Sequence, residues 1–260
     1  MITREPEEYP QPSSRLASLG RMTVFTSRNA GRAMIMLWDA ILSIRYLFIP
    51  RNWHEAVHQM FISGAKSLGI VTTVGAFTGM ILALQTGIEL RKVGQEVNTG
   101  TLVLVTMLRE MGPFMTGLIL AASVGSAYAA QIGTMVVSEE IAALEMMSIS
   151  PVRFLVMPRL VALSIMTPLL SFYMCIIGAL GGGLVAQTQL NVAWVAYWDN
   201  ALQFAKVKDM YVGLCKSVIF GIIITTVACH QGFSTQQGAV GVGNATRRTV
   251  IISFLFILAV

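Results

Sequence analysis

Two adjacent charges, Arg109 and Glu110, stand inside a long apolar stretch of the sequence. A charge near the centre of a bilayer costs roughly 2.5–3.5 kcal/mol on insertion scales, so such residues usually face a cavity or a charged partner. Because neighbours on a helix point about 100° apart, we expect each to find its partner on another helix. Two compatible interpretations stay open: ion pairing that fixes helix packing, and a charged lining for a substrate path.

A short polar segment follows, from Ser138 to Ser148, with the sequence SEEIAALEMMS. Ser138 is suited to cap the N-terminus of a helix, and the acidic residues Glu139 and Glu140 suit the dipole of its first turn. One apolar edge, at spacings of three, is formed by Ile141, Leu144 and Met147. Flexible methionines suit docking surfaces. The segment is therefore either a surface loop or a helix that docks on another protein.

Composition sets the class of protein that must position these residues. Of 260 residues, 55% are hydrophobic and 12% are charged, against about 25% charged in soluble domains. The sequence therefore predicts an all-α polytopic membrane protein. The net charge of +5 comes from residues beside apolar runs, as the positive-inside bias places them, so no nucleic-acid partner is expected. The three cysteines lack metal or disulfide spacing, and no metal site is expected.

About five spans are expected. Proline at position 113 lacks a backbone donor and predicts a kink or a break in the second of them. Residues 230–248 have the composition of a loop, which leaves about 18 Å of helix for the last span, so that this span ends inside the membrane. The expected spans are Ser67–Ile88, Thr99–Ser138, the first two thirds of Leu160–Trp198, Tyr211–Val227 and Thr249–Val260.

Three regions are expected along the chain. Residues 1–12 are predicted to be disordered, residues 13–52 to form a basic amphipathic helix in the membrane interface, and residues 53–260 to form the transmembrane domain. A soluble helix packed on the protein is the alternative for the second region. The arginine distribution favours a cytoplasmic N-terminus.

Small residues recur every four positions in two spans, which predicts close helix packing: Gly75, Gly79, Ala83 and Gly87, then Ala121, Gly125, Ala129 and Gly133.

Several unusual runs occur in one order: LREMGP from residue 108, VGSAYAAQIGTM, SEEIAALEMM and LVMPRLVA. In this order they resemble the MlaE permease family, the membrane subunits of bacterial ABC systems that move phospholipids between the two membranes of Gram-negative envelopes. The resemblance covers the chain from about residue 15. Two positions depart from it, because the family commonly has arginine in place of Ser123 and glutamate in place of Gln131.

The resemblance implies a homodimer in the bacterial inner membrane that helps to maintain outer-membrane lipid asymmetry. It also implies a separate ATPase subunit, a periplasmic MCE-domain protein and, in many systems, a STAS-domain subunit. The implied lining of a phospholipid cavity is Leu82, Leu90, Arg109, Glu110 and Lys216. Lys216 alternatively extends to the membrane surface. The implied ATPase-coupling residues are Glu139, Glu140, Leu144, Met146 and Met147.

The chain contains no G-x-x-x-x-G-K-[ST] phosphate-binding loop, so ATP and magnesium are expected on the partner ATPase and no enzyme activity is expected here. The competing class is an ion- or proton-coupled secondary carrier that uses Arg109 and Glu110. Against it stand the absence of internal repeats, the odd number of spans and a single intramembrane acid of note. A purely structural membrane anchor is a third class, but it has no use for charges at that depth.

Overall fold

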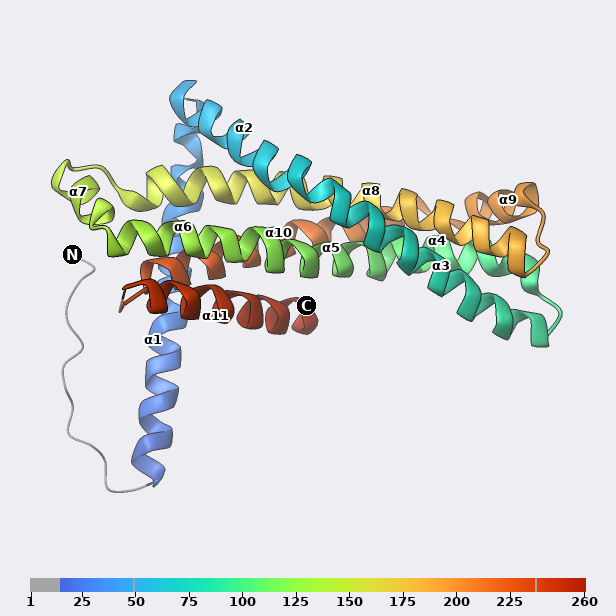
Figure 1. The fold of residues 1–260 in the computed structure, drawn as a ribbon, viewed down its shortest axis with the longest axis horizontal. Helices are drawn as coiled ribbons and strands as arrows, with labels where there is room; N and C mark the ends of the chain where they lie inside the picture. Colours follow the sequence, from blue (N-terminus) through green and yellow to red (C-terminus); the bar gives the residue numbers. More distant parts are fainter. Residues whose placement is uncertain (1–14, 49, 237) are drawn as a thin grey trace.

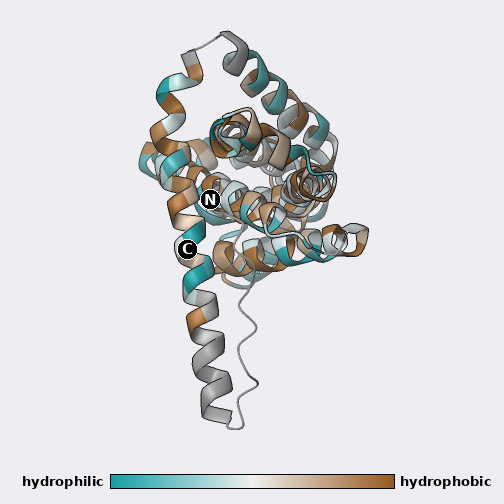
Figure 2. Cartoon of the chain, turned by 90° about the vertical axis from the view of Figure 1, so that its left-hand side faces the viewer, coloured by the Kyte–Doolittle hydropathy of each residue, from teal (hydrophilic) through white to brown (hydrophobic). Residues whose placement is uncertain are grey.

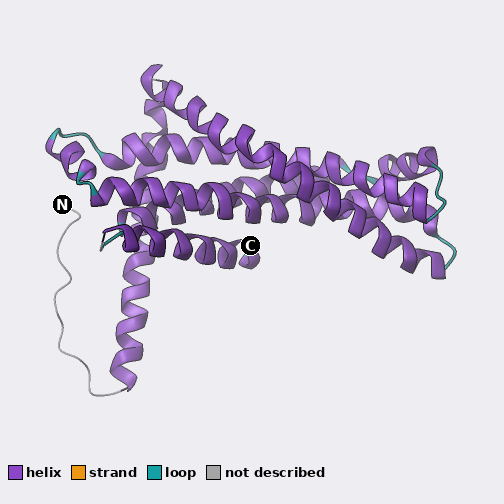
Figure 3. Ribbon diagram, viewed as in Figure 1, coloured by secondary structure: helices purple, strands orange, loops and turns teal. Residues whose placement is uncertain are grey.

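The computed structural model describes residues 15–48, 50–236 and 238–260, and within these ranges the secondary structure is helical, with short loops between the helices (Figures 1 and 3). The segment predicted to be disordered, residues 1–12, lies outside the described residues. The α-helices are α1 (Arg15–Leu42), α2 (Pro50–Gly64), α3 (Leu68–Lys92), α4 (Thr99–Thr106), α5 (Gly112–Leu120), α6 (Ser126–Val137), α7 (Glu140–Met146), α8 (Met157–Gln189), α9 (Trp194–Phe204), α10 (Val207–Phe233) and α11 (Gly238–Ala259).

Five helical segments of the described chain are long and apolar enough to cross a membrane, and even the shortest has 22 residues. At about 1.5 Å per residue, that length exceeds a hydrocarbon core of about 30 Å. The prediction of a multi-pass α-helical membrane protein is therefore confirmed. The segments are Trp53–Lys92, Glu96–Val137, Val152–Gln189, Val207–Phe233 and Gly238–Ala259.

The second span contains two π-helical turns, η4 (Met107–Met111) and η5 (Ala121–Gly125). Pro113 has no N–H to offer the carbonyl four residues before it, and this loss favours a wider turn. The amide of Gly112 accordingly donates to the carbonyl of Met107, five residues back. The break that the proline predicts is thus a π turn within a continuous helical segment.

Glycine-mediated contact joins α3 to α8. A Cβ atom on Gly79 would collide with the carbonyl of Gly178, and one on Gly181 with the carbonyl of Ala76. The two backbones therefore touch without intervening side chains, as small residues permit in membranes. All members of both predicted small-residue stripes are buried, which confirms close packing. The second stripe faces α10 and α11, where Gly125 lies against Ile224 and Thr249.

The last helix corrects a prediction. Residues 230–248 were expected to form a loop, but α10 continues to Phe233 and α11 begins at Gly238. Gly241 and Ala245 are buried in α11, which packs on α6 and α10. Tertiary packing of small residues thus outweighs the low helix propensity of the glycines.

Helix α1 runs across the long axis of the bundle at the end where α7 lies (Figure 1). Viewed along the bundle, α1 passes along one side and extends beyond it (Figure 2). Met36 and Ala40 pack against the bundle, while Met34, Ile35 and Trp38 are exposed. The 3₁₀ helix η1 (Ser43–Phe48) then leads to α2.

Helix α9 lies at the opposite end of the bundle and packs on α4 (Figure 1). Its Tyr197 is fully buried and donates a hydrogen bond from its hydroxyl to the carbonyl of Ala179 over 3.1 Å. Burial raises the pKa of the Tyr197 hydroxyl above its ordinary value. No span was expected over the residues of α9 (Trp194–Phe204), and the helix there was not predicted.

Candidate functional site

The π turn η4 carries both Arg109 and Glu110, and each pairs with a residue of α10. Arg109 Nε lies 3.7 Å from Asp209 Oδ1, and Lys216 Nζ donates to Glu110 Oε2 over 2.8 Å. The prediction that the two charges find partners on another helix is confirmed. The two ion pairs are neighbours, and their two positive and two negative charges cancel in this part of the spans.

The spacing on α10 explains how both pairs form. Asp209 and Lys216 are seven residues apart, so they lie on one face of the helix about two turns from each other. Between them, Gly213 lies against the carbonyl of Leu108, so closely that a Cβ atom there would collide with it. The glycine therefore sets the approach of the two backbones, and the ion pairs form on either side of it.

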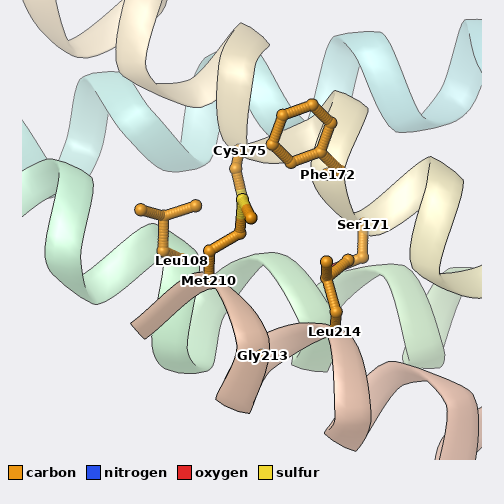
Figure 4. A pocket seen from close by; sticks show the side chains of 7 residues that line it. All are labelled: Leu108, Ser171, Phe172, Cys175, Met210, Gly213 and Leu214. Carbon is orange, nitrogen blue, oxygen red and sulfur yellow. The ribbon is translucent and has the colours of Figure 1, made fainter. Parts of the chain in front are cut away.

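A small apolar pocket lies where the π turn meets α8 and α10 (Figure 4). Leu108 comes from the π turn, Ser171, Phe172 and Cys175 from α8, and Met210, Gly213 and Leu214 from α10. The thiol of Cys175 donates to the carbonyl of Met107 over 3.1 Å. That carbonyl therefore accepts from both Cys175 and Gly112, which stabilises the wider turn from two helices.

A second, shallow hollow, open to the outside, lies along the exposed face of α10, and all the residues that line it belong to this one helix. Apolar side chains such as Val207, Val212 and Ile219 form most of its wall, and Lys208 and Lys216 stand within it. Lys216 thus belongs both to the hollow and to the ion pair with Glu110. Such a surface combines apolar contact with positive charge, which matches an anionic headgroup attached to acyl chains.

The two leucines predicted to line the same cavity take no part in the ion pairs of the described residues. Leu82 is partly buried on α3, where it packs against the cluster that includes Val103 and Met107. Leu90 is in the last turns of α3, and its carbonyl accepts hydrogen bonds from Val93 and Gln95. Neither leucine lines the hollow on α10. Of the five predicted cavity residues, the structure joins Lys216 to Glu110, with Arg109 next to Glu110 in the same π turn.

The predicted docking segment forms the short helix α7, but Ser138 does not cap it. The hydroxyl of Ser138 has two acceptors within hydrogen-bond distance, the carbonyl of Thr134 at 3.0 Å and Glu140 Oε1 at 2.9 Å. Glu139 precedes the helix in the left-handed conformation, with φ 62°. Because the chain turns sharply at Glu139, the serine stays with the end of α6, and its predicted role as the N-cap is wrong.

Helix α7 projects from one end of the bundle and packs on α6 (Figure 1). Its coupling candidates are accessible: Met146 and Met147 are 87% and 69% exposed, Glu139 and Glu140 are exposed, and Leu144 is partly buried. Large apolar side chains so exposed next to acidic residues indicate an interaction surface.

The contact between Arg159 and Gln131 was not predicted from the sequence. Arg159 is only 6% exposed, and its Nη2 donates to Gln131 Oε1 over 3.2 Å. Its guanidinium carbon also lies 5.3 Å from the centre of the Tyr128 ring. The sequence did offer a signal for this contact, because Arg159 stands inside an apolar run, where a charge needs a partner. Asp209 was missed because it lies 100 positions from Arg109 in the sequence.

A comparison with known proteins identifies the family of the chain. A family model described as Permease MlaE matches residues 56–260. The chain belongs to the MlaE permease family. It is 34% identical over 246 residues to the intermembrane phospholipid transport system permease protein MlaE of Haemophilus influenzae, covering 94% of this chain and 93% of that protein.

Other relatives of this MlaE-family chain come from different organisms. A probable ABC transporter permease protein of Rickettsia conorii is 35% identical over 241 residues, covering 93% of this chain and 92% of that protein. The chloroplastic protein trigalactosyldiacylglycerol 1 of Arabidopsis thaliana is 30% identical over 204 residues, covering 78% of this chain and 58% of that protein. The resemblance inferred from the sequence motifs is confirmed.

Proposed function

We propose that this chain is the permease subunit of an ABC transporter that moves phospholipids between inner and outer membranes and so maintains outer-membrane lipid asymmetry. The observation that carries the proposal is the pair of ion pairs between η4 and α10, next to an apolar hollow. A phospholipid offers both of the matching parts, a phosphate for the cations and acyl chains for the apolar wall. The name of the Haemophilus influenzae relative supports this substrate class.

Within the site, Arg109 is the residue best placed to take a phosphate. Its contact with Asp209 is long at 3.7 Å, and its side chain is 53% exposed. The contact between Lys216 and Glu110 is shorter, at 2.8 Å, and the lysine side chain is 29% exposed. An incoming anionic headgroup therefore competes more easily for Arg109, while Lys216 holds the turn against α10. We place Leu82 and Leu90 on a cavity completed by a second copy of the chain.

The energy source in this proposal is a separate ATPase, which binds ATP and magnesium. Its docking site is α7, through Glu139, Glu140, Leu144, Met146 and Met147, because this helix presents exposed methionines beyond the end of the bundle. α7 connects the second and third spans, so force applied to it reaches α6 and α8 directly. A periplasmic MCE-domain protein and a STAS-domain subunit complete the assembly.

The same proposal fixes the orientation in the inner membrane. The α7 end of the bundle and the N-terminus face the cytoplasm, and α1 lies in the membrane interface. The transverse course of α1 supports this placement, since a helix perpendicular to the spans lies in the plane of the bilayer (Figure 1). Arg28 and Arg32 are exposed on α1, while the side chain of Arg21 lies outside the described ones.

Reconstitution into liposomes tests the proposal. The chain, co-purified with its ATPase, is expected to move a labelled phospholipid only with ATP, and Arg109→Ala should lower the rate. Arg91→Ala, an exposed arginine in the last turn of α3, is the matched control and should leave the rate unchanged. Transport by the chain alone, driven by a proton gradient, would show a secondary carrier instead.

A further inference from the structure

Two arginines from distant parts of the sequence converge on the ring of Tyr46. The guanidinium carbon of Arg153 lies 3.4 Å from the ring centre, and that of Arg45 lies 4.9 Å from it. Arg45 Nη2 also donates to the hydroxyl of Tyr46 over 3.2 Å. Because both distances are measured to the same ring centre, the separation of the two guanidinium carbons cannot exceed the sum of these two distances.

This cluster, Arg45–Tyr46–Arg153, carries two positive charges without a described acidic partner. The ion pairs among the described residues join other side chains, and neither arginine takes part in them. Like charges held this close repel each other, and contact with one aromatic ring offsets only part of the repulsion. An anion in contact with both guanidinium groups would reduce the repulsion, and phosphate matches the guanidinium fork well.

The surroundings of the cluster are those of a membrane surface. Tyr46 lies in η1 and Arg153 in the π turn η6 (Val152–Val156), at the α7 end of the bundle. Arg45 is exposed, and Tyr46 and Arg153 are partly buried, so a ligand can reach them. Just before the cluster, α1 exposes Trp38, Ile41 and Leu42, at 64%, 41% and 55%. Apolar side chains next to arginines suit acyl chains next to a phosphate.

We propose that Arg45, Tyr46 and Arg153 bind the phosphate of an anionic phospholipid from the surrounding bilayer, with its acyl chains along the exposed side chains of α1. This lipid is a resident one, because the cluster lies at the end of the bundle opposite to α9 (Figure 1). The bound lipid ties α1 to the start of α8. The inference does not depend on which substrate the chain transports or on what drives it.

Lipid binding to the full-length purified chain, measured by native mass spectrometry, tests this site. Phosphatidylglycerol should bind more tightly than phosphatidylcholine, and each of Arg45→Gln and Arg153→Gln should weaken its binding about fivefold, as expected for one arginine at a charged membrane surface. Arg91→Gln, an exposed arginine on α3, is the matched control and should leave binding unchanged. If Arg153→Gln does not fold, the exposed Arg45 provides the decisive variant.

Three results would overturn the inference. Equal phosphatidylglycerol binding by wild type and Arg45→Gln would show that the cluster does not hold the headgroup. Inorganic phosphate that displaces the lipid at equal concentration would show a site for a free anion, without use of the acyl chains. Loss of the co-purifying ATPase with unchanged lipid binding would assign the arginines to a protein partner.

Discussion

Lys216 donates a hydrogen bond to Glu110 over 2.8 Å and thereby joins α10 to the π turn η4 across 106 positions of the sequence. The side chain of Lys216 is 29% exposed beside apolar residues of α10, and that of Glu110 is 53% exposed. Removal of one partner leaves the other charge unpaired within a membrane-spanning segment, which is costly. The pair is therefore the first place to test how the site is held together.

Replacement of Lys216 by methionine should lower both stability and phospholipid transport. It leaves Glu110 without a donor, which costs about 1–3 kcal/mol of the free energy of unfolding. Lys92→Met is the matched control, since Lys92 pairs with Glu89 at 2.7 Å but both side chains are about two-thirds exposed; its effect should stay below about 1 kcal/mol. Thermal unfolding in detergent measures both. The exchanged pair Glu110→Lys with Lys216→Glu should recover part of the loss, and a complete lack of recovery would argue against the pairing.

A methyl group at position 213 should separate the π turn from α10. In Gly213→Ala, the new Cβ meets the carbonyl of Leu108, and relief of this clash costs about 1–3 kcal/mol. Both ion pairs then lengthen, so transport should fall together with stability. Gly69→Ala is the control, because nothing lies within 4 Å of a Cβ atom there and alanine favours the helix. Unchanged activity of Gly213→Ala would show that the approach at this glycine is not needed.

Aspartates on the apolar edge of α7 should prevent the ATPase from docking. Leu144→Asp with Met147→Asp places charges on an accessible helix, so the fold should be affected by less than about 0.5 kcal/mol. The amount of ATPase that co-purifies should nevertheless fall strongly. Val195→Asp is the matched control, a similarly exposed apolar residue on α9 at the other end of the bundle. Equal ATPase recovery from both variants would mean that the subunit docks elsewhere.

A carboxylate in place of the Gln131 amide should stabilise the protein. The buried Arg159 now donates to a neutral oxygen at 3.2 Å, and Gln131→Glu supplies a charged acceptor worth roughly 1–3 kcal/mol. Gln131→Leu removes the acceptor and should destabilise by a similar amount. The melting temperatures of Gln131→Glu and Gln131→Leu, each compared with that of the wild type, test this prediction, and a Gln131→Glu variant that melts no higher than the wild type would contradict it.

The sequence predicted the fold class and the close packing well, for local reasons. Long apolar runs and stripes of small residues at Gly75–Gly87 depend on composition and on the four-residue spacing of one helix face. The insertion cost of Arg109 and Glu110 similarly predicted partners on another helix. These inferences need no knowledge of which helices are neighbours.

The remaining features depend on contacts between distant segments. Asp209 became a partner of Arg109 only through the packing of α10 on η4, and no local pattern marks it. The start of α11 at Gly238 depends on packing against α6 and α10, which overrides a loop-like composition. The prediction of Ser138 as the N-cap of α7 failed for a different reason. The chain turns at Glu139, which has left-handed backbone angles, and this turn leaves the hydroxyl of Ser138 beside the carbonyl of Thr134 at the end of α6.

The glycine contacts of α3 with α8 have a mechanical consequence. At Gly79 and Gly178 the two backbones meet directly, with no side chain between them that could change rotamer to let the helices separate or rotate. We expect these two helices to move together. The interface of α10 with the π turn combines one such backbone contact, at Gly213, with two ion pairs whose long side chains can reorient, so we expect α10 to pivot about this glycine more readily than α3 moves on α8.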